Sequence, residues 1–199
     1  MFCLSRPTEQ RIRATLVWQQ IQHFSYPEVG ASRGPLPLGY TVLHNRADLG
    51  RGSATFVQAI EAVSRWKMFD FPGIWLCWPN VPIQPGSVVA VLMKHFGFWS
   101  LNFCRIVYVI DEDGPVRRYG FAYGTLPEHA EQGEERFTVE WDRTSDLISY
   151  DILSFSRPGS FKTRVTYPVA RWLQRSFVSN SLVAMARAVK GRPETLPDR

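Results

Sequence analysis

The sequence predicts one α+β domain in which an antiparallel, curved β-sheet wraps around a long C-terminal helix. The 199 residues fit a single hydrophobic core, because such cores grow to about 250 residues before chains divide. Hydrophobic residues make up 45% of the chain and charged residues 21%, as in ordinary globular domains. Apolar runs rich in β-branched residues follow one another before a long helical pattern, and consecutive strands pair as an antiparallel meander. We expect an ordered core over about residues 8–190 and a flexible tail over 191–199.

The first half of the chain carries two helical patterns separated by a strand. Thr8 and Ser53 are suited to cap helices, and apolar residues recur at helical spacing after each. Between them lies a Pro- and Gly-rich stretch without periodicity, followed by an alternating run that ends at Gly50. These patterns predict a helix over 9–24, a loop over 26–39, a strand over about 39–49 and a second helix over about 54–69.

The second half of the chain has the pattern of several strands and one long helix. Runs rich in Val, Ile, Phe, Tyr and Trp are separated by turn signals, of which DEDG at 111–114 and PEHAEQG at 127–133 are the clearest. After SRPGS at 156–160, apolar residues such as Leu173, Phe177 and Met185 lie near helical spacing. We therefore expect strands over 87–94, 98–111, 117–126, 134–142 and 146–156, and a helix over about 163–189.

Basic residues are concentrated at the C-terminal end. The formal net charge is +5, and residues 161–199 hold eight basic side chains against two acidic ones. Such an end suits nucleic acid, phospholipid headgroups or an acidic partner, and it also suits a solvated helix face. Acidic residues on the predicted sheet argue against a broad nucleic-acid footprint, so nucleic acid is not expected as a partner.

The cysteines and the apolar stretches bear on the compartment. Cys3, Cys77 and Cys104 are far apart and form no CxxC pair, which suits reduced thiols and predicts a cytoplasmic protein. His95 and Arg105 interrupt the longest apolar stretches, so none reaches about 20 residues and no transmembrane segment is expected. Neither a GxGxxG nor a P-loop motif is present, so nucleotide-binding α/β folds are not expected and no cofactor is predicted.

Several segments resemble a known protein family. Residues 119–137, YGFAYGTLPEHAEQGEERF, resemble the DUF1990 family of domains of unknown function, also called UPF0548. The segments GYTVLHNRADLGRG at 39–52, FCRIVYVIDEDG at 103–114 and YDILSFSRP at 150–158 are similar to it as well. The resemblance implies a START/Bet v 1-like helix-grip fold, and with it an apolar cavity between sheet and helix. It carries over no catalytic residues.

The first candidate polar cluster is His44-Asn45-Arg46, on or just after the first predicted strand. Strand alternation places His44 and Arg46 on one face and Asn45 on the other. If His44 and Arg46 face inward, they could orient a ligand carboxylate or phosphate, Arg46 by bidentate hydrogen bonds and His44 by a titrating donor. The alternative is a strand-end cluster that satisfies nearby backbone groups.

A second cluster flanks the turn at 127–133. Tyr123 precedes the turn, His129 lies in it, and Glu134 and Glu135 follow it, so alternation lets only one of the two glutamates point inward. An inward carboxylate near His129 or His44 would form an acid–base pair or a weak metal site, whereas a hydrogen-bonded, charged hairpin is the alternative. The spacing lacks the tight repeats of zinc sites such as HExxH, so no metal is predicted.

Aromatic residues make up 14% of the chain, and Trp66 and Tyr108 are among those placed in predicted elements. They would either line a ligand cavity, on the order of 300–1,000 Å³, or fill a close-packed core. A helix-grip fold favours a cavity, since a sheet wrapped around one helix often leaves space for a ligand.

The combined interpretation is a protein that binds a small apolar or amphipathic molecule between the sheet and the C-terminal helix, driven by burial of apolar area. Polar residues at one end would fix the headgroup of this ligand. The alternatives are an enzyme on the same scaffold, with His44 or His129 and Glu134 as an acid–base pair, and an interaction module that uses the basic helix. No catalytic residue is assigned. The candidate ligand-binding residues are His44, Arg46, Trp66, Arg105, Tyr108, Tyr123, His129 and Glu134.

Overall fold

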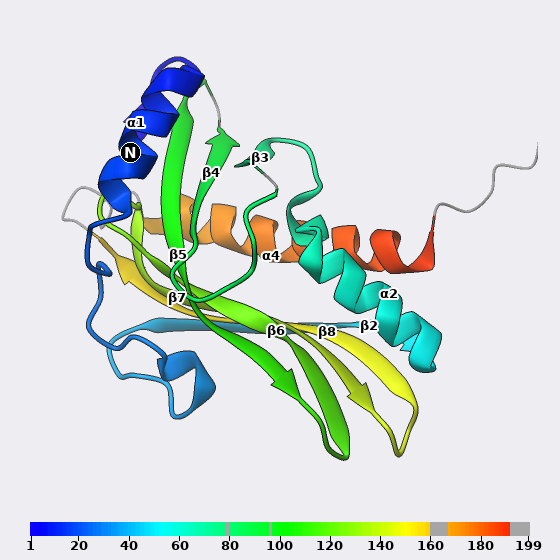
Figure 1. The fold of residues 1–199 in the computed structure, drawn as a ribbon. Helices are drawn as coiled ribbons and strands as arrows, with labels where there is room; N and C mark the ends of the chain where they lie inside the picture. Colours follow the sequence, from blue (N-terminus) through cyan, green and yellow to red (C-terminus); the bar gives the residue numbers. More distant parts are fainter. Residues whose placement is uncertain (79, 96, 160–166, 192–199) are drawn as a thin grey trace, which may run out of the picture.

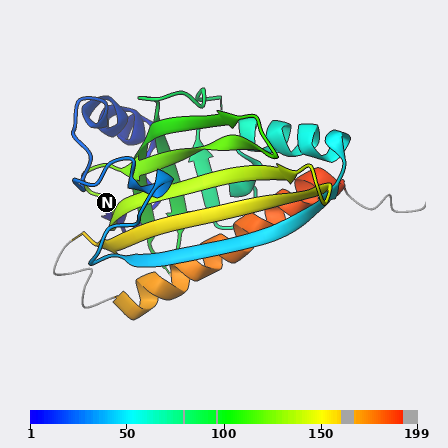
Figure 2. The ribbon, with the colours of Figure 1, turned by 90° about the horizontal axis from the view of Figure 1, so that it is seen from below.

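A computed structural model describes residues 1–78, 80–95, 97–159 and 167–191. Its main feature is a curled antiparallel sheet in the order β2-β8-β7-β6-β5-β4-β3, with β1 paired to β5 (Figure 1). The first long strand, β2, pairs with the last, β8, and forms one edge of the sheet (Figure 2). The strands are β1 (Phe2–Cys3), β2 (Thr41–Arg51), β3 (Ile74–Cys77), β4 (Val88–Lys94), β5 (Trp99–Glu112), β6 (Val116–Thr125), β7 (Glu131–Asp142) and β8 (Leu147–Pro158).

Helices cover both faces of the sheet. The long helix α4 (Tyr167–Lys190) and α2 (Ser53–Ser64) lie against the concave face, with the short 3₁₀ helix η2 (Lys67–Phe69) beside them (Figure 1). On the outer face, α1 (Glu9–Gln19) packs through Ile12 against β4 and β5, and the segment that contains η1 (Ala31–Arg33) lies against β7 and β8. The predicted fold class is therefore confirmed: a curved antiparallel sheet grips a long C-terminal helix.

Two helices end earlier than their apolar patterns predict. Helix α1 ends at Gln19 instead of residue 24, because the Nη2 of Arg105 donates to the carbonyl oxygens of Gln19 and Gln20. Helix α2 ends at Ser64 instead of residue 69, because Trp66 adopts a left-handed conformation with φ of 56° and starts η2. The predicted helix residues 163–166 and the predicted tail at 192–199 lie outside the described residues.

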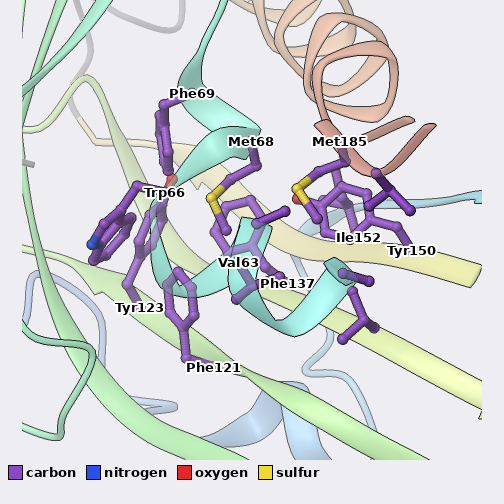
Figure 3. Packing of buried hydrophobic residues seen from close by; sticks show 14 of the residues in the cluster. Val63, Trp66, Met68, Phe69, Phe121, Tyr123, Phe137, Tyr150, Ile152 and Met185 are labelled. Carbon is purple, nitrogen blue, oxygen red and sulfur yellow. The ribbon is translucent and has the colours of Figure 1, made fainter. Parts of the chain in front are cut away.

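The core lies between the concave face and the two helices. Figure 3 shows Met185 from α4 beside Tyr150 and Ile152 of β8, and Val63 from α2 in the same cluster near Phe137 of β7. The aromatic side chains of β6 and β7 continue this core, with the ring centroids of Phe121 and Phe137 5.3 Å apart. Helix α2 and the C-terminal half of α4 thus fill one end of the sheet's concave face, and the N-terminal half of α4 covers the other end.

Candidate functional site

A cavity of about 170 Å³ lies at the end of the concave face where the β6–β7 turn meets the N-terminal half of α4. Its walls come from η2, from β3 to β8 and from α4. Phe69 and Phe177, whose ring centroids are 5.5 Å apart, line the cavity and also pack in or against the core cluster. The apolar lining consists of Phe2, Phe69, Ile74, Val91, Met93, Phe155, Leu173 and Phe177.

Glu135 is the central polar residue of the cavity. The hydroxyl of Tyr123 donates to its Oε2 at 2.8 Å, and both residues line the cavity. Burial raises the pKa of Glu135 to about 7, which the hydrogen bond from Tyr123 opposes and the neighbouring carboxylate of Glu131 reinforces. A carboxyl with this pKa exchanges its proton near neutral pH, so it can bind a cation in one state and donate a hydrogen bond in the other.

Two further polar groups of the cavity have no protein partner among the described residues. They are Oδ1 of Asn102 and Oγ of Ser154, whose residues are only 6% and 3% exposed. Ser154 is the direct ladder partner of Glu135, and Asn102 lies on β5. A buried polar atom without a partner is unfavourable by about 1–3 kcal/mol, so these atoms mark a place where a ligand's polar group would be stabilised.

The two histidines of the cavity are neutral at physiological pH. Burial lowers the pKa of His129 to about 4, and its Nδ1 accepts the backbone N–H of Glu131 at 3.0 Å. Burial also lowers the pKa of His95, whose Nε2 shares a hydrogen bond of 2.7 Å with Ser100. Neither histidine therefore supplies positive charge to balance the carboxylates of Glu131 and Glu135.

A groove of about 380 Å³ adjoins the cavity between the edge strand β3 and α4. It shares Ile74, Met93, His95, Leu173 and Phe177 with the cavity. The cavity itself is smaller than the predicted 300–1,000 Å³, because aromatic side chains occupy much of the concave face, as the close packing of Tyr123 and Phe137 in Figure 3 shows. The concave face thus holds a filled core at one end and a cavity smaller than predicted at the other.

Three of the sequence-predicted residues line the cavity: Tyr123, His129 and Glu134. The carboxylate of Glu134, however, is turned away toward the segment around η1. It accepts hydrogen bonds from the Tyr26 hydroxyl, the Gly30 N–H and the N–H and hydroxyl of Ser32. Glu134 therefore anchors this segment to the sheet, and Glu135 is the inward member of the pair.

His44 and Arg46 lie on the outer face of the sheet, so the expectation that they face a cavity is wrong. His44 Nε2 is 2.6 Å from Oδ2 of Asp151, and Arg46 donates from Nε to Oγ of Ser149 at 2.8 Å and from Nη2 to Glu140. The alternation of β2 sends Leu43 and Leu49 into the core, which fixes His44 and Arg46 on the opposite face. Because His44 and Glu134 each have other partners, the structure does not join them as an acid–base pair.

Arg105, Tyr108 and Trp66 also lie away from the cavity. Arg105 binds the carbonyl oxygens at the end of α1, on the outer face. The register of β5 and β6 shifts between Ile106 and Tyr108, so Ile106 enters the core while the Tyr108 hydroxyl lies 2.5 Å from Oγ of Ser32 on the other face. Trp66 fills the core, and its indole N–H donates to the Val81 carbonyl at 3.1 Å.

The sequence analysis named Glu135 as one of two alternating glutamates but chose Glu134 as the candidate, and it missed Asn102 and Ser154 as site residues. Strand alternation gives a signal for these residues. Glu135 lies two residues from buried Phe137 on β7, and Ser154 lies two residues from buried Ile152 on β8, so each shares the core-facing side of its strand. Asn102 likewise has the parity of Cys104 on β5. Polar residues at core-facing positions were therefore the informative ones.

Within residues 1–78, 80–95, 97–159 and 167–191, no group of three His, Cys, Asp or Glu side chains is arranged to hold a metal ion. In the same ranges, no helix combines the length and hydropathy needed to cross a membrane. On α4, Arg175, Arg187 and Lys190 are exposed, whereas Arg164 of the predicted basic helix lies outside the described residues.

Comparisons with known proteins give relatives along nearly the whole chain. The family model described as "Domain of unknown function (DUF1990)" matches residues 25–184. A UPF0548 protein from Dictyostelium discoideum is 34% identical over 208 residues, which cover 95% of this chain and 96% of the relative. A UPF0548 protein from Deinococcus radiodurans is 33% identical over 189 residues, which cover 88% of this chain and 92% of the relative.

Solved structures are similar in fold at low sequence identity. A hypothetical protein from Helicobacter pylori matches with a TM-score of 0.50 and 8% identity, over 83% of this chain and 95% of the other. Human STARD10 matches with a TM-score of 0.45 and 10% identity, over 98% of this chain and 86% of the other. The extent of the family match and the identity to the two UPF0548 proteins show that the chain belongs to the DUF1990 (UPF0548) family.

Proposed function

We propose that the protein binds a small apolar or amphipathic molecule in the cavity between the sheet and α4. The observation that carries this proposal is the cavity of about 170 Å³, with apolar walls and a few convergent polar groups. An apolar cavity of about 150 Å³ accepts a benzene ring, so this cavity suits a molecule of about one ring with a short polar arm.

Apolar burial alone would give this ligand modest affinity. A ring that buries about 150 Å² gains about 4 kcal/mol at 25 cal/mol per Å², which corresponds to a dissociation constant of about 1 mM. Polar contacts to Glu135, Ser154 or Asn102 would add affinity and would determine which apolar molecules bind.

The groove beside β3 supports a route into the cavity. It shares five lining residues with the cavity and leads to the edge of the sheet. Because β3 has only four residues and pairs on one side, a small displacement of this edge would disturb few backbone hydrogen bonds. A ligand longer than one ring would extend from the cavity into this groove.

Native mass spectrometry of protein purified from its own host, followed by denaturing extraction, tests the proposal. The parent chain is expected to carry a stoichiometric small molecule. Val91→Phe places a ring against the cavity and is expected to lose the bound mass, although overpacking destabilises it by about 1–3 kcal/mol. Val57→Phe is the matched control, because Val57 is 63% exposed on α2.

Two results would count against ligand binding. One is the absence of bound mass together with the absence of any thermal shift across a panel of lipids, isoprenoids and single-ring compounds. The other is a bound mass that Val91→Phe retains at the parent's stoichiometry, since that molecule would occupy a different place.

We also propose a cytoplasmic location. Cys3, Cys77 and Cys104 are free thiols, which supports a reducing compartment. Fractionation of host cells with detection of the native chain tests this, and recovery in a membrane or extracellular fraction would contradict it.

A further inference from the structure

The charged side chains of the cavity have one sign. Glu131 and Glu135 line it, and none of the lining residues in the described part of the chain is lysine or arginine. This is unexpected in a chain with 23 Lys and Arg against 18 Asp and Glu. Glu131 interacts with Arg171 of α4, whereas no cation among the described residues acts on the half-buried carboxylate of Glu135. A desolvated carboxylate without a cationic partner is unfavourable, so the cavity favours a bound positive charge beside Glu135.

The remaining polar atoms of the cavity point to the same chemistry. Asn102 donates from Nδ2 to Oγ of Ser100 at 3.1 Å, which leaves its Oδ1, an acceptor, as the unpartnered atom. Oγ of Ser154, beside Glu135 in the ladder, can also accept. These oxygens and the Glu135 carboxylate together form a group of acceptors.

An ammonium group fits acceptors better than the other small polar groups do. It carries three donors and a positive charge, whereas a hydroxyl carries one donor and no charge. A carboxylate or phosphate would add negative charge beside Glu131 and Glu135. Resting on the proposed function, we propose that the cavity binds an apolar molecule that carries a protonated amine, with the ammonium group against Glu135 and Ser154.

Among the described titratable groups around Glu135, Glu131 is the one whose charge acts on it. Burial raises the pKa of Glu131 as well, and Ser156 of β8 and Arg171 of α4 oppose that shift. Other titratable groups of the surroundings are Tyr123 on β6, Cys104 on β5 and Tyr150 on β8, whose pKa values burial raises, and His129 and His95, whose pKa values burial lowers. The N-terminal amine of Met1 acts on His129, and burial lowers the pKa of this amine as well. The described residues of α4 that line the cavity, Leu173, Gln174 and Phe177, do not titrate.

The test uses three probes of matched size on the full chain: 2-phenylethylamine, 2-phenylethanol and 3-phenylpropionate. They share a phenyl ring and a two-carbon linker and differ in the charge of the polar end. Titrations followed by NMR at about pH 8 and low salt are expected to give the amine about tenfold tighter binding than the alcohol, and the carboxylate the weakest binding. The amine's affinity is expected to fall as the pH is lowered through 7, while that of the alcohol stays constant.

Two variants distinguish an effect of the Glu135 carboxylate from an effect of the chain's net charge. Glu135→Gln keeps an acceptor for the Tyr123 hydroxyl and is expected to bind the amine and the alcohol equally. Glu61→Gln, on the exposed surface of α2, removes the same charge from the chain and is expected to keep the parent's preference for the amine. The pH titration of the parent chain gives the same information if Glu135→Gln does not fold.

The outcomes distinguish this inference from the proposal on which it rests. Equal binding of amine and alcohol by the parent overturns the amine preference and leaves ligand binding in the cavity standing. A preference for the amine that Glu135→Gln retains overturns the role of Glu135. Failure of all three probes, in a chain that carries no small molecule from its host, overturns both.

Discussion

Replacing Glu135 by glutamine is expected to stabilise the protein at alkaline pH and to leave its stability nearly unchanged at acid pH. Burial holds the pKa of Glu135 at about 7 in the folded chain, against 4.5 in an exposed glutamate. The folded state therefore binds this proton more tightly than the unfolded state does. The carboxyl destabilises the fold progressively as the pH rises from 4.5 to about 7, and fully above that.

The size of the effect follows from the pKa difference. At 1.36 kcal/mol per pKa unit, the ionised carboxyl lowers the free energy of unfolding by about 3 kcal/mol above pH 7. Glutamine has nearly the same shape and accepts the Tyr123 hydroxyl, but it does not ionise. Glu135→Gln is thus expected to gain about 3 kcal/mol over the parent at pH 8 and less than about 1 kcal/mol at pH 5.

Urea unfolding followed by tryptophan fluorescence, at several pH values between 5 and 8, measures this difference. Glu61→Gln is the control, because its carboxylate is exposed on α2 and keeps its hydration. Parallel stability curves for parent and Glu135→Gln over the whole range would refute the reasoning. They would mean that Glu135 ionises in a well-solvated environment and that the cavity does not desolvate it.

Three further predictions concern other parts of the structure. As the pH falls from 6.5 to 4, the parent is expected to lose up to about 3 kcal/mol of its free energy of unfolding, because the folded state keeps His129 neutral while the unfolded state protonates it. His129→Gln is expected to lack this loss when both chains are compared by acid unfolding. Glu134→Gln turns an amide N–H₂ toward the donors of Gly30 and Ser32, so the free energy of unfolding in urea is expected to fall by about 2–4 kcal/mol. Hydrogen exchange at Gly30 and Ser32 is expected to be faster, and unchanged exchange would contradict the anchoring role. Gly120→Ala places a Cβ 2.1 Å from the Phe137 carbonyl oxygen, so we expect a thermal midpoint lower by at least 5 °C, and a parent-like midpoint would show that β6 and β7 can separate.

The strands were predictable because their signals are local. Alternating and β-branched runs placed β4 to β8 within a few residues of their observed bounds, and turn residues at 127–133 marked the hairpin beside the cavity. The ends of α1 and α2 were less predictable. Arg105, which is distant in sequence, binds the end of α1, and the left-handed backbone of Trp66 ends α2 before its apolar pattern does.

The candidate site was only partly predictable. Tyr123 and His129 follow from the hairpin. The sequence analysis left open which face His44 and Arg46 occupy, although Leu43 and Leu49 are the core-facing residues of that strand. The candidate residues were chosen from clusters of polar residues in the sequence. The polar residues with unpartnered atoms in the cavity are instead isolated within apolar runs. Asn102 is one such residue, with buried Leu101 and Phe103 on either side.

The sequence by itself determined the order of the elements and the antiparallel meander gripping a C-terminal helix, because hydrophobic periodicity and turn chemistry act over a few residues. Only the tertiary structure decided which polar groups share the cavity. The register shift after Ile106 turns Tyr108 outward, and the segment around η1 holds the Glu134 carboxylate on the outer face. The pKa of Glu135 depends on desolvation by neighbours from several strands and α4, and no local pattern in the chain encodes that surrounding.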